Sequence, residues 1–112
     1  MTLDQVRRVL EPALDGDTWS GVLEALRANR AQLWIEGQSA MITELWTKGG
    51  EMDCLHVWLA GGSLGELLAL KPKVEQQARE WGCKRVTIAG RMGWDRVLKD
   101  YTRRGDELEK VL

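Results

Sequence analysis

Several residue types are scarce in this sequence of 112 residues, and each scarcity excludes a class of protein. The two cysteines, Cys54 and Cys83, stand outside any CxxC or Cys/His spacing, and the chain has one histidine. We therefore expect neither a disulfide scaffold nor a zinc site made by the protein alone. No apolar run approaches the roughly 20 residues that span a bilayer, and the N-terminus lacks the pattern of a signal peptide. We expect no membrane association, and free thiols in a reducing, cytoplasmic setting.

Phenylalanine is absent, and six tryptophans against one tyrosine supply almost all of the aromatic surface. The net charge of −1 does not favour capture of nucleic acid. The charge is nevertheless uneven, because residues 1–66 carry 5 Lys/Arg and 10 Asp/Glu, whereas residues 67–105 carry 10 and 4. A basic second half can bind phosphates or an acidic partner. We prefer the simpler explanation, that these basic residues solvate helix faces. We expect protein partners and no nucleic acid.

A hydrophobic content of 44% and a charged content of 29% are those of an ordinary globular protein, so we expect residues 1–112 to form one domain. Two helices open the chain. Thr2 with Gln5 makes a capping box, and Thr18 is the N-cap candidate of the second helix. Apolar residues then recur at helical spacing in both segments.

Three strand-like runs follow, at residues 32–36, 40–46 and 52–60. The turns between them are short, which predicts an antiparallel meander. The third run contains Val57, Trp58 and Leu59 without interruption, which indicates burial on both faces.

A crossover leads from the third strand to a fourth. Ser63 with Glu66 makes a second capping box, and Gly82 is placed to end the helical region. Pro72 lacks an N–H, so we expect a short helical turn at residues 64–70 and a main helix that restarts at Pro72. The strand at residues 84–89 then lies parallel to residues 52–60 in a β-α-β unit.

The rest of the chain predicts a loop at residues 90–93, a helix at residues 94–101 with Val97 and Leu98 inward, and a last strand at residues 107–112. The predicted fold class is α+β: an antiparallel meander and one parallel crossover in a mixed sheet, with flanking helices.

This order of elements resembles the GNAT family of N-acetyltransferases. Three stretches carry the resemblance, RAQLWIEGQSAMITEL, LHVWLAGG and EWGCKRVTIAGRMGWDRVLKDY, and their phrasing is similar to small GNAT-like proteins encoded by tailed phages and prophages. The resemblance implies that acetyl-CoA is the cofactor of an enzyme with this fold. The main chain around Leu59 would hold the pantetheine arm. The loop after the third strand would hold the pyrophosphate, which makes Gly61, Gly62, Ser63 and Gly65 the cofactor-binding candidates.

Two departures from the family pattern weaken the catalytic interpretation. No Arg or Gln precedes the glycines at the spacing of the family's phosphate signature. Leu98 stands where many members have the Tyr that protonates the leaving thiolate, and Tyr101, the substitute proton donor, falls one turn later. We therefore expect a GNAT-like domain without acetyltransferase activity and without a cofactor. It would be a phage or prophage accessory or virion-associated protein, in the host cytoplasm or in the virion.

The alternative is an acetyl-CoA-dependent N-acetyltransferase that acts on a small-molecule or protein amine. His56 would then be the catalytic base, since its ordinary pKa suits proton transfer at neutral pH. A hydrogen-bonded histidine on a sheet face is the structural explanation of the same residue. Gly61 and Gly62 likewise predict either an anion site or a sharp turn. No metal site is expected.

Overall fold

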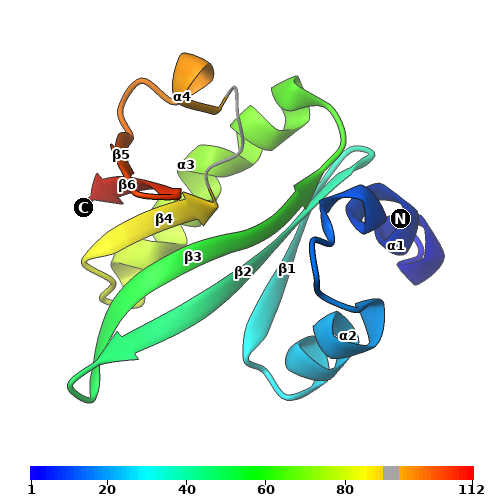
Figure 1. Cartoon of the computed structure of the whole chain (residues 1–112), viewed down its shortest axis with the longest axis horizontal. Helices are drawn as coiled ribbons and strands as arrows, with labels where there is room; N and C mark the ends of the chain where they lie inside the picture. Colours follow the sequence, from blue (N-terminus) through cyan, green and yellow to red (C-terminus); the bar gives the residue numbers. More distant parts are fainter. Residues whose placement is uncertain (90–93) are drawn as a thin grey trace.

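Helices lie on both sides of a mixed β-sheet in this computed structural model, which describes residues 1–89 and 94–112 (Figure 1). Within the described residues, six strands form one sheet in the order β1-β2-β3-β4-β6-β5. The predicted α+β class, with a mixed sheet and flanking helices, is confirmed. The elements are α1 (Leu3–Leu10), η1 (Glu11–Ala13), α2 (Trp19–Arg27), β1 (Ala31–Glu36), β2 (Ser39–Lys48), β3 (Glu51–Gly61), α3 (Leu64–Glu80), β4 (Arg85–Ala89), α4 (Trp94–Val97), β5 (Thr102–Arg104) and β6 (Glu107–Val111).

Side-chain caps start the first two helices where the sequence predicts them. The hydroxyl of Thr2 accepts from the N–H of Gln5 at 3.2 Å, and the Gln5 side chain accepts from the N–H of Thr2 at 2.7 Å. The hydroxyl of Thr18 accepts from the N–H of Gly21 at 3.1 Å. Each cap satisfies main-chain donors that the first turn of a helix leaves without a partner, so both predicted starts are confirmed.

The strand pairings also follow the predictions. β1, β2 and β3 pair antiparallel in sequence order, with a tight turn at residues 37–38 where Gly37 has a φ of 57°. β3 and β4 pair parallel, from Cys54 opposite Arg85 to Val57 opposite Ile88. Helix α3 connects these two strands, which gives the expected β-α-β unit.

A β-bulge at Trp58 changes which side of the sheet the end of β3 faces. Ile42 pairs with Leu59 and the adjacent Thr43 pairs with Val57, so Trp58 is the extra residue. Val57 therefore packs under α3, whereas Leu59 packs under α1 and α2 on the opposite face. The prediction of burial on both faces holds for Val57 and Leu59, but Trp58 is only half-buried.

Helix α3 is continuous from Leu64 to Glu80, so the predicted restart at Pro72 is wrong. Pro72 lies on the exposed side of the helix, where water can solvate the carbonyl of Leu68 that the missing N–H leaves without a helical partner. Leu70 before the proline and Val74 and Ala78 after it are buried against the sheet. Burial of that apolar stripe holds the helix together across the proline.

The C-terminal segment departs most from the predictions. Helix α4 ends at Val97 and a turn follows at residues 99–100, so Tyr101 lies outside the helix and the predicted helix to residue 101 is wrong. Leu98 is buried as expected, but Val97 is exposed. β5 was not predicted. It forms a hairpin with the predicted last strand, β6, which itself lies antiparallel to β4. The loop predicted at residues 90–93 lies outside the described residues.

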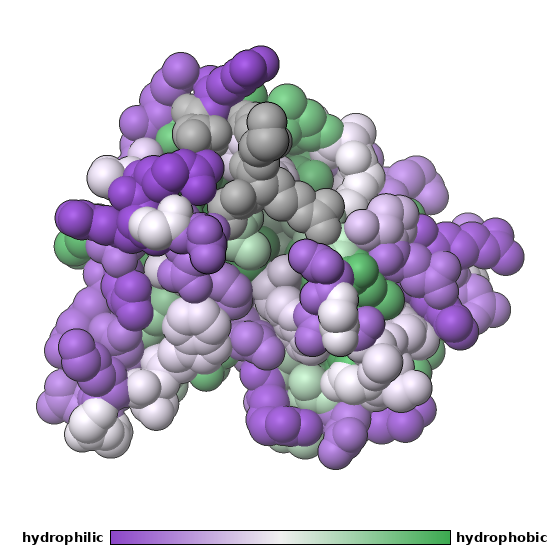
Figure 2. Space-filling view, viewed as in Figure 1, coloured by the Kyte–Doolittle hydropathy of each residue, from purple (hydrophilic) through white to green (hydrophobic). Residues whose placement is uncertain are grey.

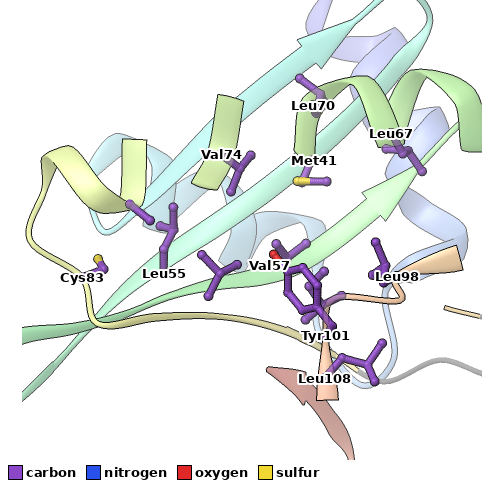
Figure 3. Close-up of a cluster of buried hydrophobic side chains, with 13 residues drawn as sticks. Met41, Leu55, Val57, Leu67, Leu70, Val74, Cys83, Leu98, Tyr101 and Leu108 are labelled. Atoms are coloured by element: carbon purple, nitrogen blue, oxygen red, sulfur yellow. The ribbon is translucent and has the colours of Figure 1, made fainter. Parts of the chain in front are cut away.

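Two hydrophobic cores lie on opposite faces of the sheet. The larger core is between the sheet and α3, and Figure 3 shows its side chains converging from the strands, α3 and the C-terminal segment. The smaller core is between the sheet and the two N-terminal helices; it includes Val6, Leu10 and Val22. The sheet strands contribute to both cores, so each helical layer depends on the same strands for its packing.

Candidate functional site

β3 extends beyond its parallel ladder with β4, and this unpaired end of β3 is the divergence of the two strands. Their parallel ladder ends at Val57 opposite Ile88, whereas β3 continues for four more residues to Gly61. Among the described residues, no β4 residue pairs with β3 beyond Val57. This divergence is the place in the fold where a ligand can approach main-chain groups of β3.

An apolar cavity lies beneath the divergence, between the sheet and α3. Its walls include Val57, Leu67, Ile88, Leu98 and the ring of Tyr101, and its volume is about 20 Å³. That volume holds little more than one water molecule. A more open groove of about 360 Å³ adjoins it, between the N-terminal end of α3 and the α1–η1 segment. A ligand much larger than a water molecule would need this groove, because the cavity is too small for it.

The glycines after β3 are explained by packing. A Cβ at Gly61 would overlap the carbonyl oxygen of Val9, at the end of α1. A Cβ at Gly62 would overlap the side chain of Ser39, and Gly62 also has a φ of 117°. Both positions therefore require glycine for close contact with another segment of the chain. Gly65 is different, because it is exposed and a Cβ there would meet nothing within 4 Å.

The N-terminus of α3 is capped by the chain itself. The hydroxyl of Ser63 accepts from the N–H of Glu66 at 3.3 Å, as predicted. The reciprocal half of the capping box is not formed, because the N–H of Ser63 donates to the hydroxyl of Ser39 at 2.9 Å. The Ser39 hydroxyl therefore takes a donor that an anion at this helix end would use.

The carboxylate of Glu66 accepts hydrogen bonds from three groups around this helix end. They are the hydroxyl of Ser39 at 2.7 Å, the hydroxyl of Ser63 at 3.1 Å and the N–H of Gln38 at 3.2 Å. The bond from Ser39 is the main cause that lowers the pKa of Glu66, so its charge persists at neutral pH. A fixed negative charge beside the candidate phosphate loop repels a pyrophosphate.

His56 is buried within the paired part of β3, next to the divergence. Its Nδ1 shares a hydrogen bond of 2.8 Å with the hydroxyl of Thr87, and the sulfur of Cys54 lies 3.1 Å from the same hydroxyl. The ring stacks on Trp46, with centroids 4.2 Å apart and planes 17° apart. Burial, with a smaller contribution from the positive charge of Arg85, lowers the pKa of His56 to about 4. The imidazole is neutral at pH 7 and a weak base.

His56 and Tyr101 lie on opposite faces of the sheet. Leu55 and Val57 belong to the core under α3, so the intervening His56 points to the other face. Tyr101 belongs to the core under α3 (Figure 3). The two candidate catalytic residues therefore do not face one common substrate.

That other face of the sheet is only partly covered. The smaller core covers the end of β3 but not the pair formed by β4 and β6, where Arg85 bridges Asp53 at 3.0 Å and Glu109 at 2.9 Å. In the space-filling view, the tip of the β2–β3 hairpin and α2 form two lobes with a hollow between them (Figure 2).

The hydroxyl of Tyr101 is bound inside the protein. It donates to a carboxylate oxygen of Glu75 at 2.8 Å, and burial together with this bond raises the pKa of Tyr101. Lys110 donates to Glu75 and to Asp100, at 2.8 Å each, and Lys71 lies 2.7 Å from Asp100. This network fixes the C-terminal segment on α3. A tyrosine so held and so weakly acidic is poorly suited to protonate a leaving group.

The structure thus brings Gly61, Gly62 and Ser63 together at one helix end but directs them to internal contacts. The side chain of Leu59 is buried under the N-terminal helices, and its main chain runs along the divergence. Ser39 and Glu66 are the residues that decide the chemistry of this helix end. Sequence reasoning gave Glu66 only as a helix cap and did not find Ser39, because their contact joins positions 27 residues apart.

No group of three or more His, Cys, Asp or Glu side chains suited to a metal ion occurs in the described part of the chain. No helix in residues 1–89 or 94–112 is long and apolar enough to span a bilayer. Comparisons with models of protein families, with curated proteins and with solved structures give no match to this chain.

Proposed function

We propose that this chain is a GNAT-like domain without acetyltransferase activity, which acts through its surfaces as a phage or prophage accessory or virion-associated protein. The divergence of β3 from β4 at a β-bulge, with α3 between the two strands in sequence, supports the GNAT-like assignment. The three sequence stretches that resemble small phage and prophage proteins support a role in the host cytoplasm or in the virion.

The main support for the absence of acetyltransferase activity is that the N-terminus of α3 is already bonded within the protein. A CoA pyrophosphate is a multiply charged anion, and its desolvation must be offset by several well-aimed donors. Here the N–H of Ser63 is taken by Ser39, and the carboxylate of Glu66 adds a negative charge. Gly61 and Gly62 serve contacts with α1 and β2. The helix end is built for internal packing.

An acetyltransferase also needs proton transfer, and the candidate residues are poorly suited to it. The apolar Leu98 lines the cavity wall, and the hydroxyl of Tyr101 is directed to Glu75. His56 has a pKa of about 4 and lies on the opposite face of the sheet from Tyr101. General acid–base catalysis contributes about 10²–10⁴-fold in rate, so its loss alone would leave a slow enzyme. Loss of the phosphate site as well removes affinity for the cofactor.

Calorimetric titration with acetyl-CoA and CoA tests this proposal. We expect no saturable heat, no thermal shift with either compound, and no thiol release from acetyl-CoA across a panel of amines. Binding in the low micromolar range, about −8 kcal/mol, together with turnover that a His56→Ala variant loses while it still folds, would contradict the proposal. The Glu66→Gln variant is the matched probe of the helix end. If its carboxylate is what excludes the anion, the variant binds CoA more tightly than the parent chain.

The alternative function is an acetyl-CoA-dependent N-acetyltransferase for a small-molecule or protein amine. The open groove beside the divergence is the observation that favours it. In that mechanism the main chain of Leu59 would bind the pantetheine arm, Gly61 to Gly65 would approach the pyrophosphate, and His56 would orient or deprotonate the amine. Tyr101 would have to leave Glu75 before it could donate a proton. The same titration separates the two functions.

The location of the protein separates the two variants of the main proposal. Mass spectrometry of purified virions would find the chain in stoichiometric amounts if it is structural, and would not find it if it is an accessory protein of the host cytoplasm. A chain encoded outside any phage or prophage region would contradict both variants.

A further inference from the structure

The two edges of the sheet are protected to very different degrees. An edge strand leaves alternate main-chain N–H and C=O groups without a ladder partner, and these groups are a template for another strand. β5, at one edge, has only three residues, all exposed, and two of them are arginines. Short length and charge are common protections of an edge. β1, at the other edge, has six residues with the sequence AQLWIE.

β1 carries exposed apolar side chains, and its only charged residue is Glu36, at its end. Leu33 is 38% exposed and Ile35 is 42% exposed. Both lie on the same side of the strand as Ala31, which is buried in the core under α1 and α2. Their exposure indicates that the helices leave this part of β1 uncovered. The strand contains no lysine and no proline, and its register with β2 is regular along all six residues.

We propose that β1 pairs antiparallel with β1 of a second copy of this chain, about a two-fold axis at Trp34. In that register Leu33 lies opposite Ile35 of the second copy, and Ile35 lies opposite its Leu33. Directly opposite apolar side chains of an antiparallel pair pack against each other. Gln32 lies opposite Glu36 of the second copy on the other face, where an amide can donate to a carboxylate. Each copy contributes the same patch, as a two-fold interface requires.

The distribution of charge along β1 favours a second copy in this direction. Arg30 immediately precedes the strand, and its side chain is largely exposed, with a weak contact of 3.9 Å to Glu24. Glu36 ends the strand beside the turn; one of its carboxylate oxygens bonds Lys73 of α3 at 2.8 Å, and the other oxygen is left for a partner from the second copy. Antiparallel pairing sets the basic start of one strand next to the acidic end of the other, twice across the axis. Parallel pairing would instead bring like charges together.

Sedimentation of the parent chain and of single lysine variants tests the proposal. We expect the parent to form dimers at micromolar to tens of micromolar concentration, and Ile35→Lys to weaken dimerisation at least tenfold while the chain stays folded. Val111→Lys is the matched control, because Val111 is 73% exposed on the same sheet but lies in β6, far from the β1 edge. That control should dimerise like the parent.

The register is tested by oxidation of cysteine variants. Cys54 and Cys83 are buried, so added surface cysteines react first. A mixture of Leu33→Cys and Ile35→Cys chains should give a covalent dimer in far higher yield than either variant alone. Three results overturn the proposal: a parent chain that stays monomeric, an Ile35→Lys variant that dimerises like the parent, and a monomer whose β1 pairs only with a strand of another protein.

Discussion

Three glycines at the start of α3 look equivalent in the sequence but have different surroundings. Gly61 and Gly62 face the carbonyl of Val9 and the side chain of Ser39, whereas Gly65 faces open space. Gly61→Ala and Gly62→Ala should each lower the free energy of unfolding by about 1–3 kcal/mol, because the added methyl group forces backbone segments apart. Gly65→Ala should be neutral or raise it by up to about 1 kcal/mol, since alanine favours the helix. Thermal unfolding of the three variants measures the difference. An equal response at all three positions would contradict the packing explanation.

His56 should make stability depend on pH. The imidazole binds a proton with a pKa of 6.5 in the unfolded chain but only near 4 in the native protein. The unfolded state therefore takes up the proton first as pH falls. The stabilisation is full above pH 6.5 and is lost as pH drops toward 4, by up to roughly 3 kcal/mol. Urea unfolding of the parent at pH 7.5 and pH 4.5 measures this loss.

The His56→Asn variant is the control for that experiment. It keeps a polar group near Thr87 but does not titrate, whereas the carboxylates titrate alike in both proteins. The variant should therefore lose less stability than the parent between the two pH values. Equal losses in parent and variant would show that His56 already takes up its proton in the native state at higher pH.

Pro72 marks the limit of local sequence reasoning at the scale of whole elements. The missing N–H predicts a break, yet α3 continues, because Leu70 before the proline and Val74 after it are both buried, which favours one helix docked along the sheet. Pro72→Ala restores the helical hydrogen bond and should raise the free energy of unfolding by about 1–3 kcal/mol. Chemical denaturation measures the gain. Gln76→Ala, at another exposed position of α3, should change stability by less than about 0.5 kcal/mol. A loss of stability in Pro72→Ala would mean that the packing of α3 requires the proline.

Elements with strong local signals were predictable, and elements set by distant contacts were not. Thr2 and Thr18 accept from N–H groups three residues away, so the helix starts are visible in the sequence. The parallel pairing of β3 and β4 follows from the length of the connection. Tyr101, by contrast, is held by Glu75, 26 residues earlier in the chain. β5 is three residues long, and so short a run of exposed polar residues gives no strand signal.

The sequence predicts a position for the candidate site, but not the contacts that its residues make. The pattern of strand, glycines and helix predicts a candidate site at the end of β3, and the parallel ladder with β4 ends there, at Val57 opposite Ile88. What fills the helix end depends on Ser39 and Glu66, which meet only after β2 and α3 have packed. The burial that lowers the pKa of His56 likewise depends on its tertiary surroundings. The sequence gives no local signal for contacts between residues so far apart in the chain.

At the scale of the whole molecule, the two cores should unfold together, because they share the sheet. Leu10→Ala in the smaller core and Leu70→Ala in the larger core should each cost about 2–5 kcal/mol and lower the same single transition. The calorimetric and van't Hoff enthalpies should agree in the parent and in both variants. Leu3→Ala, at an exposed position of α1, should change stability by less than about 0.5 kcal/mol. Two separate transitions in either core variant would show that the helical layers are independent.

The unequal edges of the sheet also limit how far this chain can assemble. Pairing through β1 uses the unprotected edge of both copies and leaves β5, short and rich in arginine, at each end of the joined sheet. A third copy then finds no apolar strand to extend. Growth into filaments requires two unprotected sheet edges in each copy, and this fold has one. The association should therefore saturate, and concentrated solutions should stay clear where a sheet with two open edges would precipitate.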